Sequence, residues 1–331
     1  MASLNALYKS VLVTGAAGAV GSQVLGILKD KYPDVRWVVL DLLSYAGKLE
    51  NIPGPRDSFV FYYGDVCDEK LVSHILETER IDSVIHLAAE SSVDVSFSKS
   101  FDFTRSNVLG VHVMLECVRK HVVAHPGLFK VFLHVSSDEV YGSVDDDQPP
   151  RKEEPSLFYP SNPYSCSKSC QELYCQAYAK SFKLPIIIIR MNNIISPTQH
   201  EEKLVPQVVR RLMAGEKIRV HGDGSAKRTF IHTNDVAAAF ETVLTKGTVG
   251  KIYNIGTENE YSVLDVIRTV CAIMRPGEDA NDHITFVEDR AFQDYRYSID
   301  TTALRALGWT PKMAFQESVE DVVRHVARRG A

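Results

Sequence analysis

The chain has 331 residues, of which 45% are hydrophobic and 24% charged, so it is long enough for one large α/β unit or two fused lobes around a continuous core. Its formal net charge is −5 at pH 7. Because no broad basic field is available, the composition argues against a protein that binds nucleic acid or an acidic membrane surface.

The first ten residues contain neither a charged-then-apolar stretch nor a small-residue cleavage pattern, and the apolar run at 184–189 is too short to span a bilayer. None of the six cysteines forms a C-x-x-C pair, and we identify no histidines at zinc-ligand spacing. We therefore expect a cytoplasmic protein with reduced cysteines and no bound metal.

Short apolar runs alternate with amphipathic stretches in the first half of the chain. The runs are rich in β-branched residues and predict strands at 10–14, 37–40, 59–63, 83–88, 131–136 and 185–190. Helices are predicted between them at 18–31, 69–79, 107–121 and 164–182. This alternation predicts a Rossmann-like, doubly wound parallel sheet with right-handed crossovers.

The pattern changes after Asn192, where strands are predicted only at 218–221, 251–256 and 283–287. We expect a smaller mixed α/β lobe that closes over the mouth of the sheet. The approximate division is residues 1–191 for the first domain and 192–331 for the second, and elements of the two can interleave.

The first predicted strand ends in a glycine-rich turn with the spacing G-x-x-G-x-x-G, formed by Gly15, Gly18 and Gly21. Glycines here let the backbone approach a pyrophosphate, and the following helix presents free N–H groups to it. Asp41 stands twenty residues after Gly21, at the end of strand two, where a carboxylate can bind an adenosine ribose and repel a 2′-phosphate. The arrangement therefore favours NAD over NADP.

Other residues at the carboxyl ends of the predicted strands extend this cofactor site, because the carboxyl ends of parallel strands meet at one edge of a sheet. The full set of predicted cofactor-binding residues is Gly15, Gly18, Ala19, Val20, Gly21, Asp41, Leu42, Ser44, Asp65, Val66, Leu87, Ala88, Ala89, Ser106, Tyr164, Lys168 and Asn193.

A tyrosine and a lysine stand one helical turn apart in the next motif. Asn162 and Pro163 are a good N-cap and first helical residue, so Tyr164 and Lys168 are predicted on one helix face. Lowering a tyrosine pKa by about three units requires roughly 4 kcal/mol. An ammonium about 4 Å away supplies about that much at an effective dielectric constant near 20, and a positive nicotinamide ring adds more. We expect Tyr164 to act as a base on a sugar hydroxyl while a hydride leaves the same carbon for NAD.

The motifs as a set resemble those of the extended short-chain dehydrogenases/reductases, and among these the nucleoside-diphosphate-glucose 4,6-dehydratases. The resemblance covers nearly the whole chain and rests on DLLSYAGKLENI at 41–52, GDVCD at 64–68, HLAAESSVD at 86–94, SSDEVYG at 136–142, NPYSCSK at 162–168, EKLVP at 202–206, HGDGSAKR at 221–228, YNIGT at 253–257 and DRAFQDYRY at 289–297. Its most specific part is the pair Asp138-Glu139.

The resemblance implies a lyase that oxidises carbon 4 of a glucose, eliminates water across carbons 5 and 6, and returns the hydride to carbon 6. Glu139 would remove the proton on carbon 5, Asp138 would protonate the departing hydroxyl, and Ser137 would bind the carbon 4 hydroxyl. Two adjacent acids in a closed site can hold one proton between them, which splits their roles.

The resemblance also implies contacts to the sugar nucleotide from Ser91, Asn192, Glu202, Lys203, Leu204, Val220, His221, Arg228, Arg290 and Gln293. Arg228 and Arg290 would clamp the diphosphate, since guanidinium groups match phosphate oxygens. The chain departs from the family pattern at 194–196, at Val95 and at Gln293. The stretch at 221–228 is similar to the dehydratase domain of plant rhamnose synthases, and dTDP-glucose and UDP-glucose both remain open as substrates.

Two other functions stay open. A UDP-sugar 4-epimerase or UDP-glucuronate decarboxylase would have the same fold, the same NAD cofactor and the same Tyr/Lys pair, but it would not require Asp138. An inactive NAD-binding scaffold is the other alternative. Finally, an apolar stripe at Cys166, Cys170, Leu173 and Ala177 lies on a helix that forms the dimer interface in the resembled family, so a homodimer is expected.

Overall fold

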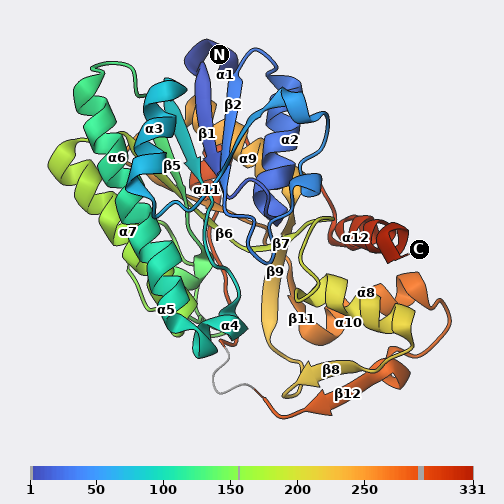
Figure 1. Ribbon diagram of the computed structural model, residues 1–331. Coiled ribbons are helices and arrows are strands. Elements are labelled where there is room, and N and C mark those ends of the chain that lie inside the picture. Colours follow the sequence, from blue (N-terminus) through green and yellow to red (C-terminus); the bar gives the residue numbers. More distant parts are fainter. Residues whose placement is uncertain (1–2, 156, 290–293, 331) are drawn as a thin grey trace.

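The computed structural model describes residues 3–155, 157–289 and 294–330. Its main sheet has seven parallel strands in the order β10-β6-β5-β4-β1-β2-β3 (Figure 1). The strands are β1 (Ser10–Thr14), β2 (Arg36–Asp41), β3 (Val60–Tyr63), β4 (Ser83–His86), β5 (Val131–Val135), β6 (Ile186–Met191) and β10 (Ile252–Ile255). The predicted fold class is confirmed, because the chain winds outward from β1 in both directions.

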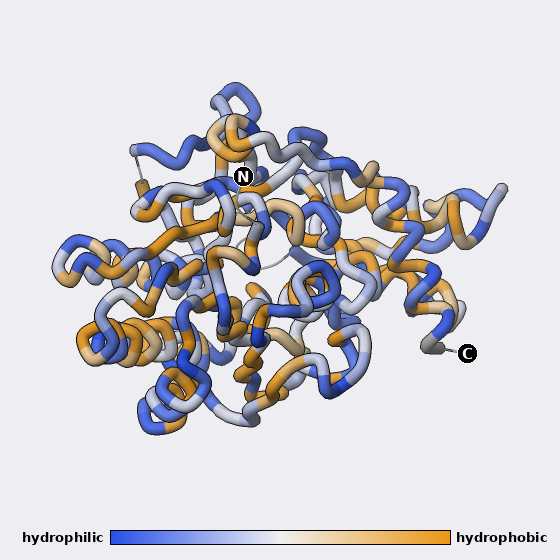
Figure 2. Tube along the Cα trace, turned by 90° about the horizontal axis from the view of Figure 1, so that it is seen from above, coloured by the Kyte–Doolittle hydropathy of each residue, from blue (hydrophilic) through white to orange (hydrophobic). Residues whose placement is uncertain are grey.

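Helices cover both faces of this sheet. Alternate residues of β1 serve the two faces: Val11 and Val13 join one core and Leu12 joins the other. The first face carries α2 (Ala19–Lys31) and α9 (Thr233–Lys246), and the second carries α3 (Glu69–Thr78), α6 (Gly110–Ala124) and α7 (Pro163–Phe182). Figure 2 shows the hydrophobic segments gathered between these layers. Burial on both faces explains why these strands are almost continuously apolar.

Helix α6 has an irregular start. The segments α4 (Val93–Ser98) and α5 (Ser100–Phe103) lead into a π-helical stretch, η3 (Thr104–Leu109), which continues directly into α6. Single π turns inside helices are frequent at functional sites. Here the π-helical stretch contains Ser106, a predicted cofactor-binding residue, and the buried Asn107.

The smaller lobe has its own hydrophobic core. It consists of a three-stranded sheet of β7 (Asn193–Ile195), β9 (Lys227–His232) and β11 (Glu260–Ser262), a pair of β8 (Ile218–His221) and β12 (Ile284–Val287), and the helices α8 (Leu204–Ala214), α10 (Val263–Met274) and α12 (Phe315–Gly330). Short helical segments complete the structure at α1 (Leu4–Leu7), η1 (Leu49–Asn51), η2 (Arg56–Ser58), η4 (Asp138–Tyr141), η5 (Ala280–His283) and α11 (Thr302–Ala306).

The strand predicted at 251–256 belongs to the main sheet and not to the smaller lobe. The strand expected at 251–256 was assigned to the smaller lobe, but β10 pairs in parallel with β6 and completes the main sheet. Tyr253, Asn254 and Ile255 are buried there, which gives the apolar edge of β6 a partner. The chain therefore returns to the first lobe after residue 192. The division into domains at 191/192 remains a proposal.

The structure also bears on the cysteines and on membrane-spanning helices. All six cysteines are free thiols. Within the described ranges, no helix is both long and apolar enough to cross a membrane.

A buried ion pair joins α7 to β6. Arg190 donates to both carboxylate oxygens of Glu172 at 2.9 and 2.6 Å, and both side chains are fully buried. The Arg190 guanidinium also lies 4.4 Å from the ring centroid of Tyr141 in η4. Removing one charge would leave the other buried without compensation.

We predict that Glu172→Gln lowers the free energy of unfolding by about 3–5 kcal/mol in urea denaturation. The matched control is Glu154→Gln, which breaks the exposed pair with Lys251 and should change stability by less than about 0.5 kcal/mol. Equal effects of the two substitutions would contradict the structural role assigned to the buried pair.

Candidate active site

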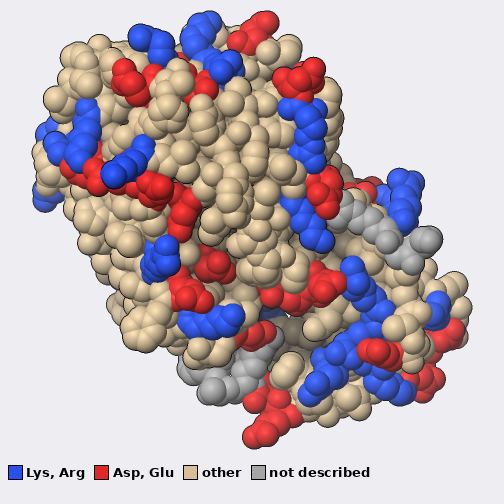
Figure 3. All heavy atoms as spheres, in the orientation of Figure 1, with Lys and Arg blue, Asp and Glu red and all other residues tan. Residues whose placement is uncertain are grey.

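A cavity of about 630 Å³ lies at the carboxyl ends of the main-sheet strands, where the smaller lobe covers them. Its lining comes from both lobes, and Figure 3 shows acidic and basic side chains around the recess between them. In a doubly wound sheet the crevice forms where the strand order reverses, here between β1 and β4. All the predicted cofactor-binding residues and all five predicted catalytic residues line this cavity.

The glycine turn after β1 is fixed by close packing. Gly15 has a φ of +71°, and a Cβ there would lie 2.6 Å from the backbone nitrogen of Ala88. The turn therefore sits directly against the end of β4. Gly18 is the N-cap of α2 and makes no side-chain cap hydrogen bond, so the first-turn N–H groups are left for an anionic ligand.

Asp41 is nearly buried at the end of β2 and shapes the adjacent loop. Its two carboxylate oxygens accept hydrogen bonds from the backbone N–H groups of Ala17 and Leu43, each at 2.8 Å. The side chain thus ties the glycine turn to the loop after β2. Each oxygen keeps a second lone pair, so the turn role and the predicted ribose contact are compatible.

The acid pair lies in η4 and is held by two asparagines. The amide of Asn192 donates to Asp138 at 2.8 Å, and the amide of Asn162 donates to Glu139 at 3.0 Å. Asn162 is also the N-cap of α7, in a capping box with Ser165, as its position before Pro163 predicts. One side chain therefore sets both the start of the Tyr164 helix and the position of Glu139.

Burial changes the acidity of the pair. It raises the pKa of Asp138 to about 6 and that of Glu139 to about 7, and the charge of Asp138 adds to the effect on Glu139. With both pKa values raised toward neutrality, the pair can hold one proton between its two carboxyl groups near neutral pH, as the resemblance requires.

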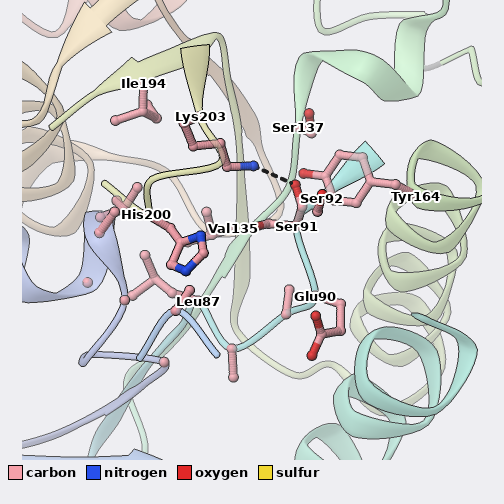
Figure 4. Close-up of a pocket in the computed structure, with 18 of the residues that line it drawn as sticks. Leu87, Glu90, Ser91, Ser92, Val135, Ser137, Tyr164, Ile194, His200 and Lys203 are labelled. Carbon is pink, nitrogen blue, oxygen red and sulfur yellow. Dashed lines mark hydrogen bonds between the residues drawn. The ribbon is translucent and has the colours of Figure 1, made fainter. Parts of the chain in front are cut away.

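Tyr164 and Ser137 face the same part of the cavity (Figure 4). Lys168 donates to the backbone oxygen of Val135 at 3.0 Å, and burial lowers its pKa to about 8. Burial and the charge of Glu139 raise the pKa of Tyr164 well above its usual range. Burial therefore opposes the predicted lowering of the Tyr164 pKa by Lys168, which stays a prediction for the site with a nicotinamide ring bound.

The predicted substrate residues divide into two groups. Ser91, Asn192, Glu202, Lys203 and Leu204 line the cavity, and Lys203 donates to the backbone oxygen of Ser91 at 3.1 Å (Figure 4). Val220, His221 and Arg228 lie outside its lining on β8 and β9, and Arg290 and Gln293 lie outside the described residues.

Arg228 is nevertheless close to the chemistry. It donates to the backbone oxygens of Asp294 and Tyr295 at 2.8 and 3.1 Å, and its charge lowers the pKa of both Asp138 and Glu139. Because these acceptors are carbonyl groups, its positive charge is not neutralised by them.

The segment that departs from the family pattern, 194–196, lies in and directly after a strand. Ile194 and Ile195 belong to β7, which pairs in parallel with β9, and Ser196 follows it. The Ser196 hydroxyl donates to the backbone oxygen of Ala19 at 3.1 Å, so the segment is tied to the first residue of α2. The altered loop therefore supports the cofactor turn.

Several residues that line the cavity are not among the predicted site residues, and they include Tyr45, Glu90 and His200. The Tyr45 hydroxyl donates to Glu202 at 3.0 Å, and the rings of Tyr45 and His200 meet edge to face at 5.0 Å. These contacts join the loop after β2 to the segment before α8 across the cavity. Tyr45 and Glu90 lie in motifs that were recognised, whereas nothing in the sequence points to His200.

Asn107 was also missed, although it organises the π turn. It accepts from the backbone N–H of Glu90 at 2.8 Å and donates back to the Glu90 carbonyl oxygen at 3.0 Å. It also donates to the hydroxyl of Ser167 at 2.8 Å. The loop after β4 and the Tyr164 helix are thus held through one buried amide.

Comparisons with known proteins agree with this geometry. A protein-family model described as GDP-mannose 4,6 dehydratase matches residues 12–322. The chain is 37% identical to a dTDP-D-glucose 4,6-dehydratase of Mus musculus, over 95% of this chain and 88% of that one. It is 41% identical to a trifunctional enzyme of Arabidopsis thaliana whose name begins with UDP-glucose 4,6-dehydratase, over 94% of this chain. The chain spans only 46% of that plant relative.

Solved structures are similar over almost the whole chain. The dTDP-glucose 4,6-dehydratase of Streptomyces venezuelae, crystallised with NAD, has a TM-score of 0.87 and 34% identity over 97% of this chain and 98% of that one. A UDP-glucose 4-epimerase of Thermotoga maritima has the same TM-score at 27% identity, over 97% of this chain and 100% of that one. The backbone alone therefore does not separate the two reactions, and the side chains of the site must.

We predict that Gly15→Ala abolishes measurable NAD binding, because the new methyl group would strain a left-handed φ and collide with Ala88. Gly127→Ala is the control, since Gly127 has a φ of +80° but no atom within 4 Å of the added Cβ. The control should lose only about 1–2 kcal/mol of stability and keep its NAD affinity. Unchanged NAD affinity in Gly15→Ala, measured by calorimetry, would be incompatible with the turn as the cofactor cradle.

Proposed function

The chain belongs to the nucleotide-sugar 4,6-dehydratase family, and from that premise we propose that it converts a nucleoside-diphosphate glucose into the 4-keto-6-deoxy sugar with NAD as cofactor. The observation that carries the proposal is the acid pair beside Tyr164 in the cavity, in which Asp138 is buried and Glu139 is half-buried. An epimerase moves hydride to and from one carbon and has no use for a second acid of this kind.

The residues of the cavity fit a dinucleotide. Gly15 leaves room at the junction of β1 and β4, the uncapped N-terminus of α2 offers donors to a pyrophosphate, and Asp41 offers free lone pairs beyond β2. NAD supplies the hydride acceptor for carbon 4 and later the hydride donor for carbon 6. Because the same molecule does both, the reaction needs no external oxidant.

Tyr164 is the proposed base for the proton of the carbon 4 hydroxyl. In the protein alone burial keeps its phenol protonated, so additional positive charge is required to ionise it. Lys168 provides one such charge from the next helical turn, and a bound nicotinamide ring provides the other. Ser137, which faces the same part of the cavity, is placed to hydrogen-bond the carbon 4 oxygen.

Elimination is the proposed task of the acid pair. A ketone at carbon 4 acidifies the proton on carbon 5, which Glu139 accepts as its carboxylate. The electrons left on carbon 5 form the double bond to carbon 6 as the hydroxyl leaves with a proton from Asp138, so one water is lost. Asn162 and Asn192 hold the two carboxyl groups in position for this transfer.

The nucleoside is proposed to be uridine or thymidine. The higher identity to plant relatives named for UDP-glucose favours UDP, and the relatives at 36–37% identity are named for dTDP-D-glucose. Substrate contacts are proposed for Ser91, Asn192, Glu202, Lys203, Leu204, Val220, His221, Arg228, Arg290 and Gln293, with Arg228 on the diphosphate. We further infer a cytoplasmic role in supplying 6-deoxy sugars such as rhamnose, and six free thiols suit a reducing compartment.

We predict that the purified chain removes one water from UDP-glucose or dTDP-glucose without added NAD, as measured by mass spectrometry. Asp138→Asn should lower kcat by about 10²–10⁴ because the acid for the departing hydroxyl is lost. Asp147→Asn, at an exposed loop position, is the control and should leave kcat unchanged. Undiminished dehydration in Asp138→Asn would refute the assignment.

We also predict that kcat/KM rises with pH through an apparent pKa of about 7, because Glu139 must be ionised to act as a base. Asp138→Asn removes the neighbouring negative charge and should shift this rising limb of the pH profile to lower pH. The measurement is the residual rate of the variant from pH 5 to 9. A limb that stays in place, or moves upward, would show that the two carboxyl groups are not coupled.

A second copy of the chain is the proposed partner. Cys166, Leu173 and Ala177, from the stripe recognised in the sequence, are exposed on α7, with Leu173 52% exposed. Leu109 and Phe101 of the preceding helical segments are 46% and 88% exposed. An apolar helical face of this kind is expensive to leave in water and supports an isologous dimer.

We predict that Leu173→Glu converts a dimer into a monomer at micromolar concentration, as measured by analytical ultracentrifugation. Met213→Glu, which places the same charge at an exposed apolar position on α8, should remain dimeric. A wild-type chain that sediments as a monomer would remove the basis of this proposal.

A further inference from the structure

Two histidines and a glutamate meet on the surface formed by α3 and α6, which lie side by side (Figure 1). His121 is in the last turn of α6, His125 is the C-cap residue of the same helix, and Glu77 is in the last turn of α3. One ligand atom from each of the three lies within 4.8 Å of the others. His121 and His125 are four residues apart, which is a known spacing of zinc ligands, so the prediction that no histidines stand at zinc-ligand spacing is wrong.

The ligand atoms are already close to the arrangement a metal needs. Nε2 of His125 is 2.6 Å from Glu77 Oε2, and Nδ1 of His121 is 3.9 Å from the same oxygen. Tetrahedral zinc with bonds of about 2.0–2.1 Å keeps its ligand atoms roughly 3.3–3.4 Å apart. Both distances involve Glu77 Oε2, so rotation of the exposed Glu77 side chain can even them out.

The tautomer of His121 is fixed by its second nitrogen. Nε2 lies 3.0 Å from the backbone oxygen of Ile81, and because a carbonyl only accepts, Nε2 must carry the hydrogen. The lone pair is therefore on Nδ1, the atom that faces Glu77. Metal-binding histidines commonly donate their other N–H to a carbonyl in this way, which orients the ring.

The backbone also favours a cation at this place. Glu77 and His121 both lie in the last turns of their helices, where the partial negative charge of the helix dipole is concentrated. Arg80 acts against this, since its positive charge is felt by both Glu77 and His121. None of these residues lines the cofactor cavity, so the cluster is separate from the site described above.

We propose that Glu77, His121 and His125 form a binding site for a divalent transition metal, and Zn²⁺ is the ion that this donor set fits best. Two imidazoles and a carboxylate supply three ligands, and water completes the tetrahedron on the solvent side, where Glu77 is 64% exposed. Mg²⁺, which requires oxygen ligands, should not bind. The metal would join the ends of α3 and α6 and stabilise the fold without taking part in the sugar chemistry.

The test uses the full chain without an affinity tag, freed of metal by a chelator and then titrated with ZnCl₂ in a calorimeter. We expect a saturable equivalent of Zn²⁺ with a rise in melting temperature, and no response to MgCl₂. His125→Ala and Glu77→Gln should each weaken binding roughly tenfold or more, since even an outer-shell change costs that much. Both variants should keep wild-type dehydratase activity, which separates this proposal from the proposed function.

Three further variants make the result specific. His74→Ala, an exposed histidine of α3 outside the cluster, and Cys166→Ser, an exposed thiol, should bind Zn²⁺ as the wild type does. Arg80→Asn should bind more tightly, because it removes a positive charge and tolerates the left-handed φ of +49°. No saturable Zn²⁺ binding, or equal affinity in the wild type, His125→Ala and Glu77→Gln, would overturn the proposal.

Discussion

The chemistry depends on two neighbouring carboxyl groups held out of water. Burial raises the pKa of Asp138 and Glu139 to about 6 and 7, so at neutral pH the pair can hold one proton and offer one base. In water both groups would be ionised and neither could act as an acid. The desolvation is tolerable only because Asn192 and Asn162 each donate a hydrogen bond to one carboxyl group.

The sheet explains why these groups meet the cofactor. The strand order reverses between β1 and β4, and the glycine turn packs against Ala88 at that point. β5 runs directly into η4, which carries the acid pair, and α7 starts beside it at the Asn162 cap. The cofactor cradle therefore lies at the ends of β1 and β4, the acids follow the end of β5, and Tyr164 begins the helix beside the acids. Their relative positions follow from the parallel topology.

Much of this was predictable because local physics and tertiary structure agree. Buried parallel strands need continuous apolar residues, and the six predicted strands of the first half all exist within a few residues of their expected bounds. The cap at Asn162 is equally local. Strand β10 was expected in the other lobe because a four-residue strand does not indicate which sheet edge it will join. The positions of His200 and Asn107 were missed for the same reason, since they act through contacts 155 and 17 residues away along the chain.

Activation of Tyr164 depends on charge as well as on position. Burial raises the pKa of the phenol, and Lys168 donates to a backbone carbonyl. A lysine one turn away lowers the pKa only if its charge, together with that of a bound nicotinamide ring, outweighs this burial. The predicted lowering of the Tyr164 pKa therefore stays a prediction about the enzyme with cofactor bound.

The central claim, that Glu139 removes the proton on carbon 5 after oxidation at carbon 4, is tested most directly with Glu139→Gln in D₂O. The variant should still reduce its bound NAD when substrate is added, seen as NADH absorbance, because Tyr164 and the cofactor are intact. It should incorporate no deuterium at carbon 5. Deuterium at carbon 5 at the wild-type rate in Glu139→Gln would contradict the account.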